Sequence, residues 1–256
     1  MGFLQIFVIG IIGSAVGSFL NSAVYRLRIR EFKSIFLGRS FCPNCKKTLR
    51  ARDLIPLVSF FLLGRKCQFC TQKISTHYFW VELITASIFG LIAWQMGFAQ
   101  NSLLLWNLLF ATVLIFLASF DFQFGEIPDE VSLPATLFAF LGSFFIFTIS
   151  PAESLVGLLI GGGFFTAIVL ASNGKWMGGG DIRMGLLLGA LLGWQGFLIA
   201  LFIASFSGSI VGIAQVIQKK KKLKSTLPFA PFLAMGGIIA LLFSEKIWEY
   251  YAQLFI

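Results

Sequence analysis

Charged residues are scarce in this sequence. Of its 256 residues only 12% are charged and 57% are hydrophobic, whereas a soluble domain carries about 25% charged and about 45–50% apolar residues. The 31 phenylalanines against 11 acidic residues exclude a soluble globular domain. They also exclude a disordered chain, because disordered segments are poor in aromatics and rich in charge. The composition therefore indicates a polytopic protein of the lipid bilayer.

The residue patterns of several functional classes are missing as well. His77 is the only histidine and no serine lies in a nucleophile-elbow pattern, so a Ser-His-Asp triad has no basis here. No Walker or dinucleotide-binding glycine pattern occurs. Nucleic-acid binding is excluded despite the net charge of +9, because the basic residues are not spread over the chain: 12 of the 20 Lys and Arg lie between Arg26 and Lys73 and five between Lys219 and Lys224. Such clusters are typical of cytoplasmic loops in membrane proteins.

Eight apolar stretches are candidates for membrane spans, since a helix of about 20 apolar residues crosses a hydrocarbon core about 30 Å thick. One is short and directly precedes Gly193-Trp194-Gln195-Gly196. Ser150-Pro151-Ala152-Glu153 predicts a capping box at the start of another. The first lacks a basic n-region and a small-residue cleavage site, so we expect a retained helix and not a signal peptide. The expected spans are 3–24, 79–96, 102–120, 131–149, 152–172, 182–194, 196–217 and 228–248.

Eight alternating spans assign the sides of the membrane. If the segment after the first span is cytoplasmic, both chain ends are outside, and the cytoplasmic segments hold 19 of the 20 Lys and Arg. This agrees with the positive-inside rule. Omitting the short span at 182–194 would place the basic run Lys219–Lys222 outside, whereas we interpret that run as a topology anchor beside anionic headgroups. The predicted cytoplasmic segments are 25–78, 121–130, 173–183 and 218–227.

All four cysteines lie in the polar segment between the first two spans. Cys42-Pro43-Asn44-Cys45 and Cys67-Gln68-Phe69-Cys70 form two C-x-x-C knuckles separated by 21 residues, and each knuckle can present two thiolates to one tetrahedral Zn²⁺. Two disulfides are the alternative, but the cytoplasm is reducing. Four thiolates leave no open position for a substrate, so we expect the metal to hold this small segment folded. The predicted zinc ligands are Cys42, Cys45, Cys67 and Cys70.

Two acidic residues at the ends of apolar spans are candidates for chemistry. Asp121 ends the third span, and Asp181 begins the sixth after three glycines; both face the predicted cytoplasmic side. Brought together, they would titrate as a coupled pair that shares one proton. The ionised partner would activate a water molecule while the other polarises a carbonyl, as in an aspartic protease. The preceding glycines would let the backbone approach a substrate strand or a neighbouring helix closely.

Helix capping is the alternative for the acidic residues. Asp181 could cap the sixth span and Asp129 the fourth, and Glu126 and Glu130 could be solvated loop charges. For Asp129 and Glu130 we favour this structural interpretation. Asp121 fits capping poorly, because a carboxylate at a helix C-terminus opposes the macrodipole. A G-x-G-D pattern alone is a weak signal, but together with Asp121 and the four-cysteine segment it becomes specific.

Motifs of one known family occur here in its order. They are Gly17-Ser18-Phe19-Leu20-Asn21, Tyr25-Arg26-Leu27, Ser40-Phe41-Cys42-Pro43-Asn44-Cys45, Asp53-Leu54-Ile55-Pro56, Cys67-Gln68-Phe69-Cys70, Ile74-Ser75, Val81-Glu82, Asp121 through Pro128-Asp129, and Gly178-Gly179-Gly180-Asp181. From about Gly10 to Gln218 the chain resembles the bacterial type IV prepilin peptidases, which are bifunctional membrane aspartic proteases and N-methyltransferases.

This resemblance implies roles for the candidate residues. Asp121 and Asp181 would be the catalytic pair and the four cysteines the zinc ligands. The substrate would be a prepilin or pseudopilin whose basic leader is cut on the cytoplasmic side, after which S-adenosylmethionine would methylate the new amino terminus. We interpret the two flanking basic residues as tuning the aspartate pair or holding backbone carbonyls. The predicted supporting residues are Gly178, Gly180, Asp129, Lys175 and Arg183.

The expected fold is an all-α polytopic integral membrane protein with about eight transmembrane helices and a small cytoplasmic zinc-ribbon-like insert after the first. We divide the chain into the first transmembrane helix (1–24), a zinc-binding segment associated by resemblance with methyl transfer (25–78), and a seven-helix aspartic peptidase domain (79–256). The expected location is the bacterial cytoplasmic (inner) membrane, with the active site facing the cytoplasm. The expected partners are the lipid bilayer and the pilin substrate, and no nucleic acid.

Two other functions compete with this interpretation. In the first, the chain is a non-catalytic membrane scaffold whose zinc ribbon docks a pilus-assembly or secretion partner; Asp121→Asn would then be harmless and loss of Cys42 damaging. In the second, it is an aspartic intramembrane protease of the presenilin-like group, which shares the G-x-G-D pattern. That group lacks the four-cysteine segment, so the cysteines argue against it.

Overall fold

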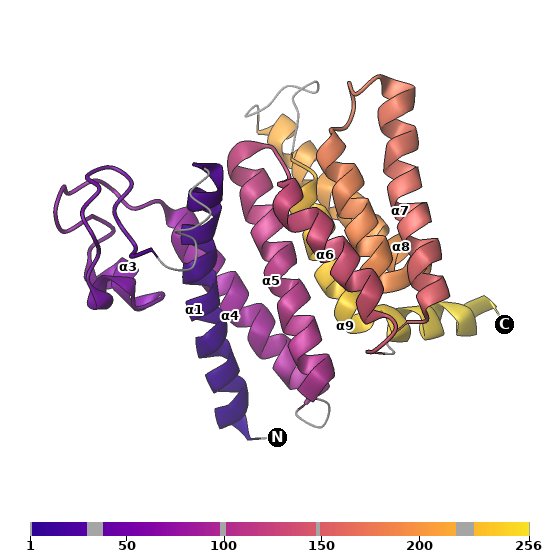
Figure 1. Cartoon of the computed structure of the whole chain (residues 1–256), viewed down its shortest axis with the longest axis horizontal. Helices are drawn as coiled ribbons and strands as arrows, with labels where there is room; N and C mark the ends of the chain where they lie inside the picture. Colours follow the sequence, from indigo (N-terminus) through magenta and orange to yellow (C-terminus); the bar gives the residue numbers. More distant parts are fainter. Residues whose placement is uncertain (1, 30–37, 98–100, 147–148, 219–227, 256) are drawn as a thin grey trace. The chain divides into compact units, whose positions relative to one another are not determined.

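Helices form nearly all of the regular structure in the residues that the computed structural model describes, which are 2–29, 38–97, 101–146, 149–218 and 228–255 (Figure 1). In that part of the chain the β pairings are two isolated antiparallel bridges, Phe41 with Thr48 and Lys66 with Lys73. The helices are α1 (Phe3–Arg28), η1 (Ala51–Leu54), α3 (Val58–Leu62), α4 (Thr76–Met96), α5 (Asn101–Phe124), α6 (Asp129–Gly142), α7 (Pro151–Ser172), α8 (Gly179–Ile217) and α9 (Ala230–Phe255).

Six helices of the described residues are long and apolar enough to cross a membrane, namely α1, α4, α5, α7, α8 and α9. Their lengths and compositions confirm the expected all-helical membrane architecture. The helical form follows from the solvent, because a chain in hydrocarbon must satisfy its backbone N–H and C=O groups internally. The basic run Lys219–Lys222 lies outside the described residues.

The long helix α8 consists of two helices that meet at Gly193. This residue has φ 67° and ψ 179°, a conformation that glycine adopts without the steric penalty of a Cβ. Adjacent residues of α9, Gly236 and Gly237, lie against Ala200 and Leu188, which are on opposite sides of the break. A single straight helix would hold those two residues about 18 Å apart. The chain therefore reverses at Gly193, between the spans expected at 182–194 and 196–217.

The start of α7 agrees with the expectation from the sequence, whereas the end of α6 differs from it. The predicted capping box of α7 is present: the Ser150 hydroxyl accepts the Glu153 N–H at 3.2 Å, and the Glu153 carboxylate accepts the Ser150 N–H at 2.8 Å. Helix α6 has 14 residues and ends at Gly142, earlier than the expected 131–149. Beyond Gly142 the hydrogen bonds tighten by one residue, because the N–H groups of Phe144 and Phe145 bind the carbonyls of Leu141 and Gly142, and the α-helix ends in this turn.

The chain divides into two compact units, residues 1–112 and 113–256. In the first unit α1 packs against α4 through glycines of α1. A Cβ at Gly13 would lie 2.7 Å from Cβ of Phe89, and one at Gly17 would lie 2.8 Å from Cα of Glu82, so the two helix axes can be this close only because both positions lack a side chain.

In the second unit α7 and the first half of α8 are in backbone contact (Figure 1). A Cβ at Gly157 would overlap the Gly189 carbonyl, and one at Gly161 would overlap the Gly185 carbonyl. As one number rises the other falls, so the two helices are antiparallel. The buried Ser154 hydroxyl adds a hydrogen bond to the Ala190 carbonyl at 2.6 Å. This contact fixes the position of the first half of α8 against α7, and with it the position of the residues at the N-terminus of α8.

Two neighbouring glycines of α7 test this packing. We expect Gly161→Ala to lower the stability of the solubilised protein by about 1–3 kcal/mol, because the added methyl group overlaps backbone and forces the helices apart. Gly163→Ala is the matched control, since a Cβ at Gly163 meets nothing within 4 Å. Thermal unfolding in detergent measures both. Equal midpoints for the two variants would contradict the backbone contact between α7 and α8.

Candidate active site and metal cluster

Asp121 and Asp181 come together in the second unit. Asp121 lies in the last turn of α5 and is 9% exposed, and Asp181 is the third residue of α8. A Cβ at Gly180, the residue before Asp181, would lie 3.0 Å from Cγ1 of Ile127 in the segment that follows Asp121, and the charge of Asp121 acts on the Asp181 carboxyl. The structure thus brings two residues that are far apart in the sequence to neighbouring helix ends.

Backbone donors at two helix N-termini face this pair. The N–H of Ala230, the first residue of α9, faces the Asp121 carboxylate, and the N–H of Gly178 faces the Asp181 carboxylate. The N-terminus of α9 compensates for the unfavourable position of Asp121 at the C-terminus of its own helix, because the positive end of a helix dipole favours an anion. Ala230 acts through its backbone and carries no side-chain signal that the sequence could have revealed.

One oxygen of the Asp121 carboxylate accepts no hydrogen bond from the described residues. This atom, Oδ2, is buried. Buried carboxylate oxygens nearly always have a partner, so this atom is an acceptor available to a water molecule or a substrate. Asp181 is partly exposed and can be reached from outside the bundle.

The glycines before Asp181 have different surroundings. A Cβ at Gly180 would lie 3.0 Å from Cγ1 of Ile127, so the G-x-G-D segment packs closely on the segment between α5 and α6. A Cβ at Gly178 would meet only the Gly180 nitrogen, at 4.0 Å. Gly178 therefore has open space beside it, while Gly180 brings two backbone segments together.

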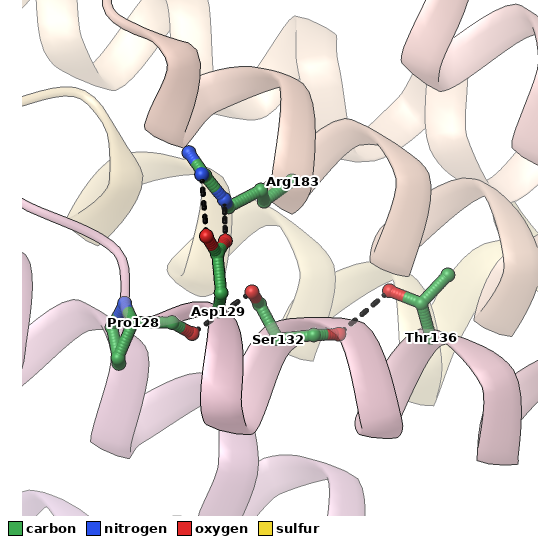
Figure 2. Close-up of polar contacts among 5 residues, drawn as sticks. All are labelled: Pro128, Asp129, Ser132, Thr136 and Arg183. Carbon is green, nitrogen blue, oxygen red and sulfur yellow. Dashed lines mark hydrogen bonds and ion pairs between the residues drawn. The ribbon is translucent and has the colours of Figure 1, made fainter.

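The start of α6 is tied to the start of α8 by an ion pair (Figure 2). The Arg183 guanidinium donates two hydrogen bonds to the Asp129 carboxylate, from Nε to Oδ1 and from Nη2 to Oδ2, the latter at 2.8 Å. Asp129 forms no side-chain cap on α6, whose N-cap is Pro128, so the capping interpretation of Asp129 is wrong. It failed because Arg183, 54 positions later in the chain, offers the carboxylate a charged bidentate partner.

The two basic residues beside the G-x-G-D segment differ. Arg183 is committed to Asp129, and Figure 2 shows both side chains beside the first turn of α6, where the Ser132 hydroxyl donates to the Pro128 carbonyl at 2.9 Å. Lys175 is exposed, and its side chain forms no hydrogen bond or ion pair with the part of the chain that the structure describes. Of these two basic residues, Arg183 is therefore the one that joins the start of α8 to the start of α6.

The four cysteines form one cluster in the first unit. Their sulfur atoms all lie within 4.8 Å of one another, and the Cys42 and Cys70 sulfurs are 3.8 Å apart. All four are free thiols. Four sulfurs bound tetrahedrally to Zn²⁺ at about 2.3 Å would be separated by about 3.8 Å. The cluster therefore fits a tetrahedral metal ion, and zinc is the ion that a four-thiolate set favours.

Two equivalent hairpins present these thiols. The Cys42 N–H donates to the Lys47 carbonyl at 3.0 Å, and the Cys67 N–H donates to the Gln72 carbonyl at 2.9 Å. The backbone N–H of Gln72 and the Asn44 amide lower the pKa of the Cys70 thiol. They therefore favour its thiolate, which is the form that binds metals.

The fold and these sites define a polytopic membrane protein with paired aspartates and a four-cysteine cluster. Residues 11–96 match the model of the bacterial peptidase A24 N-terminal domain, and residues 108–213 match that of the type IV leader peptidase family. The chain belongs to the type IV leader peptidase family. No solved structure gives a significant match.

Curated relatives named prepilin leader peptidase/N-methyltransferase match nearly the whole chain. The protein of that name from Bacillus subtilis is 32% identical over 96% of this chain and 98% of its own length. Those from Stutzerimonas stutzeri and Pseudomonas aeruginosa are each 31% identical over 95% of this chain and 92% of their own length.

We expect the purified protein to contain one zinc ion per chain. Cys67→Ser should lose most of it, because a three-thiolate site with one hydroxyl binds zinc far more weakly. Metal analysis measures the loss, and trypsin should then cut the segment 38–75 faster. A sample treated with chelator already saturated with zinc is the control. Full zinc content in Cys67→Ser would contradict the assignment.

The ion pair is tested by charge reversal. Asp129→Arg and Arg183→Asp should each lower the stability of the protein by about 1 kcal/mol, since a half-exposed pair contributes little more, and the double variant should recover most of that loss. Glu130→Arg, at the exposed neighbouring position, controls for the change in net charge. Thermal unfolding and cleavage rate are both measured. A double variant no better than the sum of the single variants would rule out the direct pairing.

Proposed function

We propose that this protein cleaves the leader of type IV prepilins or pseudopilins and then methylates the new amino terminus. Family membership supports both activities, because the curated relatives are named for both. The non-catalytic scaffold is not favoured, since the relatives that match the chain over its length are enzymes by name. The observation that carries the peptidase assignment is the close packing of the G-x-G-D segment on the segment after Asp121, which supports Asp121 and Asp181 as a pair at neighbouring helix ends.

In this proposal the two aspartates share one proton. The ionised carboxylate takes a proton from a water molecule, whose oxygen attacks the carbonyl carbon of the scissile peptide bond. The protonated carboxyl donates a hydrogen bond to the carbonyl oxygen. The carbon–nitrogen bond then breaks, and the departing amine takes up the proton that the first carboxylate removed from the water. The buried Oδ2 atom of Asp121, which has no partner among the described residues, supports a position for that water.

The substrate side of the site is proposed to be cytoplasmic. Both aspartates lie in segments that the distribution of Lys and Arg assigns to the cytoplasm, and a basic prepilin leader would be held at the inner face of the bacterial cytoplasmic membrane. The open space beside Gly178 supports the approach of an extended substrate backbone. We assign Gly180, Asp129 and Arg183 to positioning the G-x-G-D segment.

The cofactors are part of the proposal. Zinc held by Cys42, Cys45, Cys67 and Cys70 would stabilise the two hairpins and take no part in bond breaking, because four thiolates fill its coordination sphere. S-adenosylmethionine would supply the methyl group. The names of the relatives support its use. We keep the division into 1–24, 25–78 and 79–256, with the cysteine segment as part of the methyl-transfer site and the catalytic aspartates of proteolysis in the helices after it.

Prepilin cleavage in membranes tests the aspartate pair. Asp121→Asn and Asp181→Asn should each lower the cleavage rate at least about 1,000-fold, because either change removes the shared proton chemistry while keeping the size of the side chain. Glu126→Gln, an exposed carboxylate between α5 and α6, should cleave at the wild-type rate. Thermal unfolding checks that the variants are folded. Cleavage by folded Asp121→Asn or Asp181→Asn would overturn the assignment.

A further inference from the structure

A cavity of about 530 Å³ lies in the first unit, between α1, the cysteine hairpins, η1 and the start of α4. Its walls include Asn21 of α1, Asp53 of η1 and Glu82 of α4. The volume is in the range of pockets that hold small molecules, about 300–1,000 Å³. The cavity lies wholly within residues 1–112, whereas the aspartate pair belongs to the second unit, so the proposed proteolysis does not account for it.

Two buried carboxylates line this cavity. Residues 1–112 hold three of the chain's 11 acidic residues, namely Glu31, Asp53 and Glu82, and Glu31 lies outside the described residues. The other two both line the cavity, and each is 8% exposed. The surrounding segment is strongly basic, with 12 Lys and Arg between Arg26 and Lys73. Arg26, which donates to the Gly38 and Arg39 carbonyls, and Lys73 line the cavity as well, so the walls suit a ligand that carries both positive and negative charge.

Two acceptors in these walls have no hydrogen-bond donor among the described residues. Asp53 Oδ2 accepts the Arg50 N–H at 3.1 Å, but Asp53 Oδ1 is buried without a hydrogen-bond partner there, and Arg52 Nε is 3.9 Å away. The Asn21 amide donates to the Tyr78 carbonyl at 3.2 Å, which leaves its Oδ1 buried and unpartnered in the same part of the chain. Buried acceptors normally have donors, and a ligand with hydroxyl or ammonium groups would provide them.

Glu82 is held in place by a strained residue. Its Oε2 atom accepts the N–H of Leu57 at 2.7 Å, and Leu57 has φ 63°, which is rare for a residue with a branched side chain. Such strain persists where the surroundings require it and is frequent at ligand sites. The bond fixes the direction of the Glu82 carboxylate at the cavity wall.

Aromatic rings complete the lining. Tyr25 and Phe41 meet edge to face with ring centres 6.1 Å apart, and Phe60 and Phe79 are stacked at 5.2 Å; all four residues line the cavity. Such rings pack against flat heterocycles and attract cations over their faces. A ligand with a flat aromatic base, hydroxyl groups and positive charge is complementary to this combination.

We propose that this cavity binds S-adenosylmethionine, with Asp53, Glu82 and Asn21 as the polar residues that recognise it. The proposal rests on the proposed methyltransferase function and deepens it by naming the binding site. The carboxylates would face the sulfonium and ammonium charges or the ribose hydroxyls, and the rings would face the adenine. In the transfer, the nitrogen of the new amino terminus bonds to the methyl carbon as the sulfur–carbon bond breaks. S-adenosylhomocysteine remains, and the amine proton passes to water.

Direct binding tests the site without relying on turnover. Titration calorimetry with S-adenosylhomocysteine is done on the zinc-loaded, full-length protein in detergent. Asp53→Asn and Glu82→Gln keep the shape of each side chain, and we expect each to raise the Kd at least 10-fold. Glu249→Gln, an exposed carboxylate on α9, removes the same charge elsewhere and should leave the Kd unchanged. Ser22→Trp fills the cavity from α1 without removing a charge and should abolish binding.

Prepilin cleavage and zinc content are measured on every variant, and wild-type values show that the variant is folded. If folded Asp53→Asn, Glu82→Gln and Ser22→Trp all bind as tightly as the wild type, the site is overturned even where the wild type methylates. If these variants bind normally but have a raised KM for the mature pilin amino terminus, the cavity holds the methyl acceptor and the proposal is again overturned. If the wild type neither methylates nor binds, the proposed methyltransferase function itself fails.

Discussion

The burial of a carboxylate at the C-terminal end of an apolar helix is the interaction on which the second unit depends. Asp121 lies where its own helix dipole is unfavourable, so it is stable there only if donors from other elements reach it. The start of α9 provides one through the Ala230 N–H. The start of α8 brings a second carboxylate, Asp181, into electrostatic range. The ends of three helices must therefore meet at one point.

Backbone packing determines that the ends do meet. Glycines of α7 let the first half of α8 approach until backbone touches backbone, and Gly193 then reverses the chain so that the second half returns beside the first. The Asp129–Arg183 ion pair joins the start of α6 to the start of α8 at the same end. Rigid placement matters for catalysis, because a reacting group displaced by about 1 Å can cost about 100-fold in rate.

In the first unit, the segment between α1 and α4 is held mainly by polar contacts and by its cysteines. Between α1 and α4 the described residues bury few apolar side chains, Phe60 among them, so cross-links and polar contacts must hold this segment. The two cysteine hairpins offer four thiols to one metal ion. The buried Arg26 guanidinium donates to the carbonyls of Gly38 and Arg39 at 3.0 and 2.9 Å, and Glu82 accepts the Leu57 N–H. A segment held by polar contacts can leave a cavity open that an apolar core would fill.

Local sequence was enough to specify the membrane architecture, the break at Gly193, the capping box at Ser150 and the four-cysteine cluster. These features follow from composition or from short spacings, such as the two C-x-x-C knuckles, whose meaning does not depend on distant residues. The packing of the helices was needed to establish that Asp129 pairs with Arg183 and does not cap α6. It also decided that the Ala230 N–H faces Asp121. Likewise, only the packing brings Asn21, Asp53 and Glu82 to the walls of one cavity. Each of these contacts joins residues from separate helices, and side-chain chemistry alone does not specify which of several complementary partners the packing will bring within reach.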